Sequence, residues 1–301
     1  MTFRLIDPMP ITDANLVSHN IPDPSAEWAS GTTYASGDLV KVTADKRLYE
    51  SVLSSNLNNV PSQSIGVSWI DRGVMLPWRA FDGGPSSIVR RSGQIDIRMS
   101  LSNLARGVAL INVAASEFRI TVYSGATEMY DRTVELADDS GIVDYVTLFT
   151  QPPGFVDLGI VDDFIAGPGN EVRVRIGNTV ESVSVGEIVL GDVRIFGSVV
   201  SGLTSELVDY SLETIDDFGN AEIVERGYAF DRDYPIVIPN SDGGRIERTL
   251  ARLRARRGLY YINTEIANKW GVATYGRLTR LIRTADSGGV SDINVTIEGR
   301  L

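Results

Sequence analysis

Carboxylates are numerous in this sequence and are the first side chains to consider for chemistry. Three adjacent pairs stand out: Asp138-Asp139, Asp162-Asp163 and Asp216-Asp217. A glycosidase needs two carboxyl groups about 5–9.5 Å apart. Because 39 of the 301 residues are Asp or Glu, such pairs also arise by chance, and sequence spacing does not set the distance between side chains. A glycan-degrading enzyme therefore stays an alternative that the pairs do not favour.

Calcium binding is a second chemistry that these acids allow. Carboxylates in turns, together with backbone carbonyls, are the ligands that Ca²⁺ prefers. The candidate calcium ligands are Asp138, Asp139, Asp162 and Asp163. No loop carries the regularly spaced acids of a known calcium site. We therefore expect no bound cofactor.

Cysteine and histidine, the residues of many enzyme sites, are almost missing. The chain has no cysteine and a single histidine, His19. These counts exclude disulfides, thiolate metal sites, cysteine nucleophiles and sites with several histidine ligands. Asp217-Phe218-Gly219 matches a kinase tripeptide, but no glycine-rich loop or His-Arg-Asp motif accompanies it. We therefore predict that the protein is not an enzyme, and that His19 is a polar surface residue.

Charge is distributed unevenly along the chain, whose net charge is −11. Residues 206–225 hold seven acids and no base, whereas residues 245–257 hold six arginines and one glutamate. Either both runs are solvated faces, or they pair across subunits of an assembly. The candidate interface residues are Arg248, Arg252, Arg256, Asp216 and Asp217. The acidic balance argues against nucleic acid as a partner.

The elements that must position these residues are mainly β-strands. Residues 84–200 alternate between apolar and polar side chains, most clearly at 94–101, 117–124 and 171–177. A period of two predicts strands with one buried and one solvated face, as in antiparallel sheets. Gly, Pro and Asp turns separate these strands, which is typical of a β-sandwich or jelly roll.

Residues 201–301 are predicted to form a small α+β domain. Asn240-Ser241-Asp242 supplies helix caps before residues 245–257, and Gly258 closes that helix. Its apolar stripe is Ile246, Leu250 and Leu253, and its arginines recur at i, i+4. Strands are predicted at residues 222–230, 259–262 and 293–297.

Residues 1–83 divide into an arm and a small module. Residues 1–26 contain four prolines and many apolar side chains, so we expect an extended arm docked on its own chain or on a neighbour. Residues 27–83 predict a small β module that holds three of the four tryptophans. Its candidate carbohydrate-binding rings are Trp28, Tyr34, Tyr49 and Trp69. Alternatively these rings form the core, because a module this small needs them there; an exposed Trp28 or Trp69 is the sharper expectation.

Two motifs in this region carry a resemblance. The arm reads Ile11-Thr12-Asp13-Ala14-Asn15-Leu16-Val17-Ser18-His19-Asn20-Ile21-Pro22, and the module ends at Trp78-Arg79-Ala80-Phe81-Asp82-Gly83. The module resembles small chitin-binding carbohydrate modules. Residues 11–83 as a whole are more similar to the N-terminal part of a family of tailed-phage virion proteins. The strand order in residues 84–200 is also similar to galactose-binding-type sandwiches.

The resemblance indicates where such a protein is located rather than which reaction it catalyses. It implies a structural component of the virion, at the tail tip, baseplate, collar or fibre attachment. We expect such a protein to act by docking in a homo-oligomer, with copies of itself and neighbouring tail or neck proteins as partners. The alternative is a protein of the same virion that binds a host-cell glycan. We expect neither a membrane span nor a signal peptide, because the required apolar runs are missing.

Overall fold

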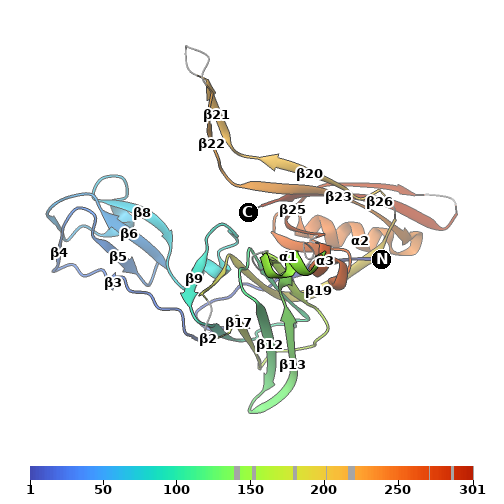
Figure 1. The fold of residues 1–301 in the computed structure, drawn as a ribbon, viewed down its shortest axis with the longest axis horizontal. Coiled ribbons are helices and arrows are strands. Elements are labelled where there is room, and N and C mark those ends of the chain that lie inside the picture. Colours follow the sequence, from blue (N-terminus) through green and yellow to red (C-terminus); the bar gives the residue numbers. More distant parts are fainter. Residues whose placement is uncertain are drawn as a thin grey trace.

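The computed structural model describes residues 1–138, 143–150, 154–178, 182–200, 202–215, 221–270, 272–285 and 288–300. Strands hold 55% of the chain and helices 11%, which confirms the predicted mainly β class. The two large sheets are antiparallel. Figure 1 shows a small module on the left, packed sheets in the centre, and long strands with a helix on the right.

The small module is built around aromatic rings. Its strands form a four-stranded sheet in the order β3-β5-β6-β8 and a separate pair, β4-β7. They are β3 (Ala26–Glu27), β4 (Thr33–Tyr34), β5 (Leu39–Val42), β6 (Arg47–Ser51), β7 (Asn56–Leu57) and β8 (Trp69–Val74), with the 3₁₀ turns η1 (Pro61–Gln63) and η2 (Trp78–Phe81). The core consists of Tyr34, Val40, Tyr49 and Trp69. So few residues bury little apolar surface, and large rings therefore fill the interior.

A five-stranded sheet forms one layer of the central region. Its order is β13-β12-β17-β10-β2. The strands are β2 (Leu16–His19), β10 (Ile95–Ser100), β12 (Glu117–Ser124), β13 (Thr127–Glu135) and β17 (Asn170–Ile176), and β9 (Val89–Ser92) pairs separately with β18 (Ser182–Val185). Burial alternates along β10 and β17, as the sequence predicts. Their apolar side chains share one core with Val108, Leu110 and Leu190 of the second layer.

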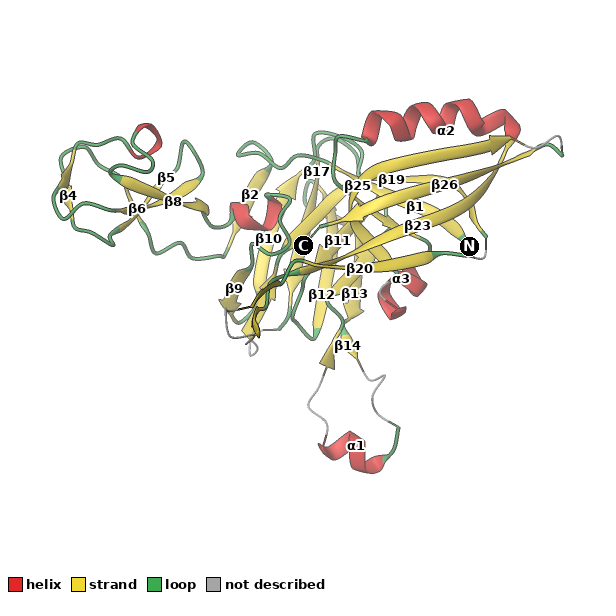
Figure 2. Ribbon diagram, turned by 90° about the horizontal axis from the view of Figure 1, so that it is seen from above, coloured by secondary structure: helices red, strands yellow, loops and turns green. Residues whose placement is uncertain are grey.

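Strands from both ends of the chain close a six-stranded barrel. Its order is β19-β1-β24-β25-β26-β23, and β23 pairs with β19 to complete the ring. The strands are β1 (Thr2–Pro8), β19 (Glu187–Val199), β23 (Tyr228–Pro239), β24 (Gly258–Tyr261), β25 (Ala273–Ala285) and β26 (Val290–Gly299). Helix α2 (Asn240–Leu253) packs Ile246, Leu250 and Leu253 on the barrel core. Figure 2 shows α2 running along these strands.

Strand β19 joins the barrel to the central region. Its first residues pair with β11 (Gly107–Ile111), which pairs in turn with β16 (Leu158–Val161), and residues 191–198 pair with β1. At Gly191 a Cβ atom would lie 1.9 Å from the carbonyl oxygen of Asp7, so a side chain has no room there. The nine-stranded sheet thus takes strands from both sides of residue 200, the domain boundary predicted from the sequence.

The predicted N-terminal arm is part of the body of its own chain. Strand β1 lies between β19 and β24, and its side chains Phe3, Leu5 and Ile6 are buried. Strand β2 forms an edge of the five-stranded sheet. The apolar content left two docking places open, the same chain or a neighbour, and the structure shows the first.

Two structures project from the body. The ribbon, a hairpin of β21 (Leu212–Ile215) and β22 (Ala221–Val224), extends from the paired strands β20 (Thr204–Asp209) and β23. It extends beyond the rest of the molecule in Figure 1. A second projection starts at β14 (Ala137–Asp138) and β15 (Gly154–Phe155) and carries α1 (Tyr145–Thr150) away from the sheets in Figure 2.

Candidate functional site

Three of the four candidate carbohydrate-binding rings lie inside the module. Trp69 is 0% exposed and its Nε1 donates to the carbonyl oxygen of Asn59 at 2.9 Å. Tyr34 meets it edge-on with ring centroids 5.3 Å apart, and Tyr49 is 1% exposed. A sugar stacks on an open ring face, so these rings cannot serve. The expectation of an exposed Trp69 is wrong, because the module has too few other apolar residues to fill its core.

Trp28 is the candidate ring that keeps part of its surface in solvent. It is half-buried and packs against the module core. Trp78, at the exit of the module, is 8% exposed, and the ammonium of Lys46 lies 3.4 Å from its ring centroid. Lys46 also pairs with Asp13 at 3.1 Å, which connects the module to the arm segment. The module therefore offers no row of aromatic faces among its tryptophans and the candidate tyrosines.

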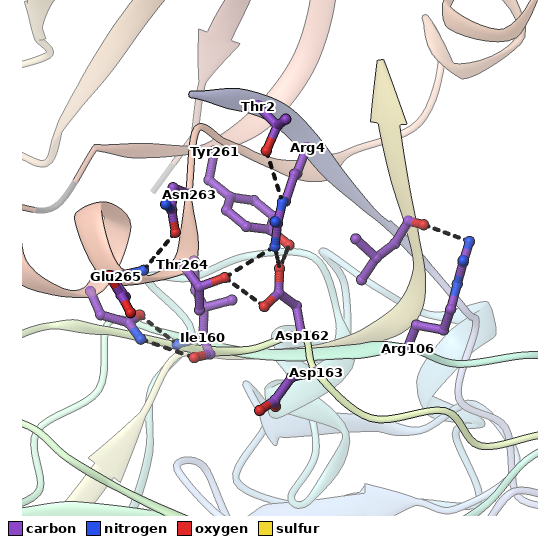
Figure 3. A network of polar contacts seen from close by, with 12 residues as sticks. Thr2, Arg4, Arg106, Ile160, Asp162, Asp163, Tyr261, Asn263, Thr264 and Glu265 are labelled. Atoms are coloured by element: carbon purple, nitrogen blue, oxygen red, sulfur yellow. Dashed lines mark hydrogen bonds and ion pairs between the residues drawn. The ribbon is translucent and has the colours of Figure 1, made fainter. Parts of the chain in front are cut away.

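The two adjacent aspartates Asp162 and Asp163 make separate sets of contacts. Asp162 accepts hydrogen bonds from Arg4 Nη1 at 2.5 Å, from the Tyr261 hydroxyl at 2.7 Å and from the Thr264 hydroxyl at 2.5 Å (Figure 3). Its side chain is 5% exposed. Asp163 pairs with Arg132 and the Tyr130 hydroxyl. Protein donors therefore occupy the carboxylate oxygens that a calcium ion would need.

Of the other two predicted calcium ligands, the structure describes one, which lies where the second projection starts. Asp138 is in β14, and Asp139 lies outside the described residues. Within the described ranges, no group of three or more His, Cys, Asp or Glu residues could hold a metal ion. The described candidates, Asp138, Asp162 and Asp163, are therefore not brought together in one such group.

The contacts of Asp162 join the barrel to the central sheets. Arg4 comes from β1, Tyr261 from the end of β24, and Thr264 from the start of α3 (Thr264–Trp270), while Asp162 follows β16. Beside them, the Asn268 side chain accepts from the N–H of Ile160 at 2.8 Å and donates to its carbonyl oxygen at 2.9 Å. Burial and the Asp162 charge raise the pKa of Tyr261, so its phenol stays protonated. These hydrogen bonds hold the barrel against the central sheets, and we call the contacts of Asp162 with Arg4, Tyr261 and Thr264 the lock.

A cavity of about 530 Å³ lies beside the turn that follows the module. Glu187, 5% exposed, lies at this cavity and accepts a hydrogen bond from the N–H of Gly83 at 2.8 Å. Tyr275, Arg257 and Asp82 also line it. Burial raises the pKa of Glu187 to about 8, and the Asp82 carboxylate adds to the effect. Asp82 itself accepts from the N–H of Gly84 at 2.8 Å, so both acids hold the turn.

The arginine row lies on the outside of α2. Arg248 and Arg252 are exposed on the helix, and Arg256 follows its end. In the described part of the chain no ion pair is made by these three, whereas Arg245 pairs with Asp242 at 3.3 Å. Asp216 and Asp217, between β21 and β22 in the sequence, lie outside the described residues. The described part of the predicted interface is therefore the helix surface.

The projections expose apolar side chains that sequence reasoning did not single out. On the ribbon, Ile215 is 65% and Ile223 69% exposed; on the second projection, Tyr145 is 82% and Phe149 83% exposed. Large apolar groups held in water at the ends of thin projections are a feature of contact surfaces. The signal was present in the sequence, because Ile215 and Ile223 fall within the acidic run of residues 206–225.

Comparisons with known proteins do not assign this geometry to a family. No family model matches the chain, and neither does any curated protein or solved structure. Among the described residues, no helix has the length and apolar character needed to cross a membrane. The case for a function therefore depends on the geometry and on the motifs of residues 11–83.

Proposed function

We propose that this chain is a non-enzymatic structural component of a tailed-phage virion that acts by docking in a homo-oligomer. The observation that carries the proposal is the pair of thin projections with exposed apolar side chains that extend from a body with large buried cores. A single chain in water gains nothing from exposing Ile223 or Phe149, whereas a docked chain buries them. The resemblance of residues 11–83 to virion proteins supports a location in the virion.

The contacts of the acidic side chains support a docking role. Asp162, Asp163, Asp82 and Glu187 are each held by arginine, hydroxyl or backbone N–H donors of the same chain. A glycosidase needs two carboxyl groups that face a substrate. Asp162 and Asp163 join sheets, and Asp82 and Glu187, which line the cavity, hold the turn at Gly83 and Gly84, as expected for a rigid spacer between docking surfaces.

The proposal is tested on the full chain and on the particle. Light scattering of the purified protein should show an oligomer, and mass spectrometry of purified particles should find the chain at a fixed copy number. A single-particle reconstruction should then place the ribbon against another protein chain. A protein that stays monomeric at every concentration and is missing from the particle would contradict the proposal.

A glycan-binding role on the same virion is the second candidate. The observation that favours it is the position of the module, which extends sideways from the body in Figure 1 with Trp28 half-buried rather than enclosed. A glycan array with the wild type and Trp28→Ala separates the two roles. Binding that is lost in Trp28→Ala supports glycan recognition, and no binding by either protein leaves the docking role alone.

A further inference from the structure

We infer that the ribbon of one copy docks on the arginine face of α2 in a second copy of this chain. The arginine face is defined as Arg245, Arg248 and Arg252, with the exposed Ala251 beside Arg248 at its edge. The inference rests on the proposed homo-oligomer and names the two surfaces that make it.

The more exposed apolar side chains of the ribbon lie on one face, whereas Leu212 and Val224 on the opposite face are 46% and 45% exposed. Residue pairing places Glu213 opposite Ile223 and Ile215 opposite Ala221. Because residues alternate between faces along a strand, these four side chains share one face. Ile215 and Ile223 are 65% and 69% exposed, with the Glu213 carboxylate beside them. This face needs a partner that is cationic and also covers apolar surface.

The ribbon is also a structure that a partner would stabilise. An isolated pair of strands is marginally stable in water, and three or more strands or a packed helix are needed for independent stability. β21 and β22 pair with each other, and no third described strand pairs with either. All the residues of these two strands are exposed.

The arginine face of α2 has the complementary chemistry. Arginine stems cover apolar surface while the guanidinium groups bind carboxylates in a planar, bidentate way. Gly244 and Ala251 are exposed small residues along the Arg248 edge of this face, so a ribbon can approach the helix closely there. The opposite face of the helix is already used, since Ile246, Leu250 and Leu253 are in the barrel core.

The partner must be a second copy because the two surfaces of one chain cannot meet. In Figure 1 the ribbon extends from β20 and β23 away from α2, which lies at the other side of the barrel strands. A contact between two different surfaces of identical chains is heterologous, and such contacts build rings when the rotation closes. Charge complementarity therefore selects a second copy over a partner of unknown surface.

Charge-changing variants test the contact in the full chain. The helix variant carries Arg248→Glu and Arg252→Glu, and the ribbon variant carries Glu213→Arg and Ile223→Arg on the docking face. Light scattering after size exclusion should show at least tenfold weaker association for each double variant. An equal mixture of the two double variants should associate again, because the intact ribbon of the helix variant meets the intact helix of the ribbon variant.

Two control variants change the net charge in the same direction as the double variants but at other positions. Glu222→Arg changes the opposite face of the ribbon, because Glu222 pairs with Thr214 and alternates with the docking residues. Arg90→Glu reverses an exposed arginine of β9, far in sequence from α2. Both controls should associate like the wild type.

A disulfide test keeps the charges in place. The chain has no cysteine, so Ala221→Cys in one preparation and Ala251→Cys in another introduce one thiol each. Mild oxidation of the mixture should give a covalent dimer of the two variants, whereas neither variant should cross-link when it is oxidised alone. Circular dichroism checks that each variant is folded.

The outcomes separate this inference from the proposed function. If the wild type assembles but both double variants assemble as well as the controls and no cross-link forms, the inference fails and the proposed homo-oligomer stands. If the wild type is monomeric throughout, both fail. A cross-link together with weakened assembly of both double variants supports the inference.

Discussion

The body of the molecule and the ribbon contain similar apolar residues in opposite environments. In the barrel, Phe3 is 0% exposed, and its ring centroid lies 4.9 Å from the ring centroid of Tyr234. In the ribbon, Ile215 and Ile223 are mostly exposed although their strands are regularly paired. Apolar side chains in the barrel core therefore stabilise the fold, whereas those of the ribbon lie in water and would be buried only by the docking that we propose. The substitutions considered next change either the packed body or the exposed ribbon.

The largest effect is expected in the barrel core. Phe3→Ala removes a ring that contacts Phe196, Tyr234 and Tyr260 and leaves a cavity inside the barrel. It should lower the free energy of unfolding by about 3–5 kcal/mol. Denaturant unfolding of wild type and variant measures this loss. A loss below about 1 kcal/mol, the size of an ordinary surface change, would mean that β1 is not an integral strand of the barrel.

Glu187 should make stability depend on pH. Its pKa is about 8 in the folded chain and 4.5 in the unfolded chain. Between these values the unfolded state has lost the proton that the folded state keeps, so stability should fall as pH rises from about 5 to 8 and level off above that. The expected fall is on the order of 3–4 kcal/mol.

Glu187→Gln is the control for this pH dependence. The amide oxygen can still accept the N–H of Gly83, but the side chain no longer titrates. Denaturant unfolding at pH 5 and pH 8.5 should therefore show a much smaller fall in the variant. An equal fall in both proteins would assign the effect to another group.

Asp162 should contribute through the lock between the barrel and the central sheets. Asp162→Ala leaves Arg4, Tyr261 and Thr264 without their shared acceptor, and in the described chain Arg4 pairs with no other carboxylate. The expected loss is about 2–3 kcal/mol. Asp163→Ala, whose carboxylate is half exposed, is the neighbouring control and should cost less than about 1 kcal/mol. Equal losses of unfolding free energy in Asp162→Ala and Asp163→Ala would show that the lock stabilises the fold no more than a half-exposed ion pair does.

The smallest effect on stability is expected in the ribbon. Ile223→Ser changes a side chain that is 69% exposed. The free energy of unfolding should therefore stay within about 0.5 kcal/mol of wild type. Association should nevertheless weaken, because the apolar contact with the partner is lost. Denaturant unfolding and light scattering on the same samples measure both, and a stability loss above about 2 kcal/mol, typical of a core position, would show that Ile223 is part of the fold.

Local patterns in the sequence were enough for α2 and for several strands, but the predicted strand at residues 222–230 is divided into β22, which ends at Val224, and β23, which begins at Tyr228. Alternation predicted β10, β12 and β17, because each has one buried and one solvated face. The helix runs over Asn240–Leu253, earlier than the predicted 245–257. The predicted cap residues start the helix itself, without a side-chain cap hydrogen bond, and Gly258 begins β24. The apolar stripe determined the helix face, whereas the ends depend on the neighbouring strands.

Long-range pairing explains what the sequence did not predict. β1 reaches its place between β19 and β24 through partners at positions 191–198 and 259–261, and no local pattern specifies that register. The Arg4–Asp162 contact likewise joins distant parts of the chain. For the aromatic module, residue types alone could not separate core rings from exposed rings. Its small size decides the question, since Tyr49 and Trp69 are needed inside.

Deletion of the ribbon tests the central claim most directly. Asp209 and Tyr228 face each other in the β20–β23 pair, so an Asn-Gly turn can join them in place of positions 210–227. Light scattering and denaturant unfolding would be measured on the wild type and on this shortened chain. The account predicts an oligomeric wild type and a shortened chain that is equally stable but monomeric. A shortened chain that assembles like the wild type would contradict it.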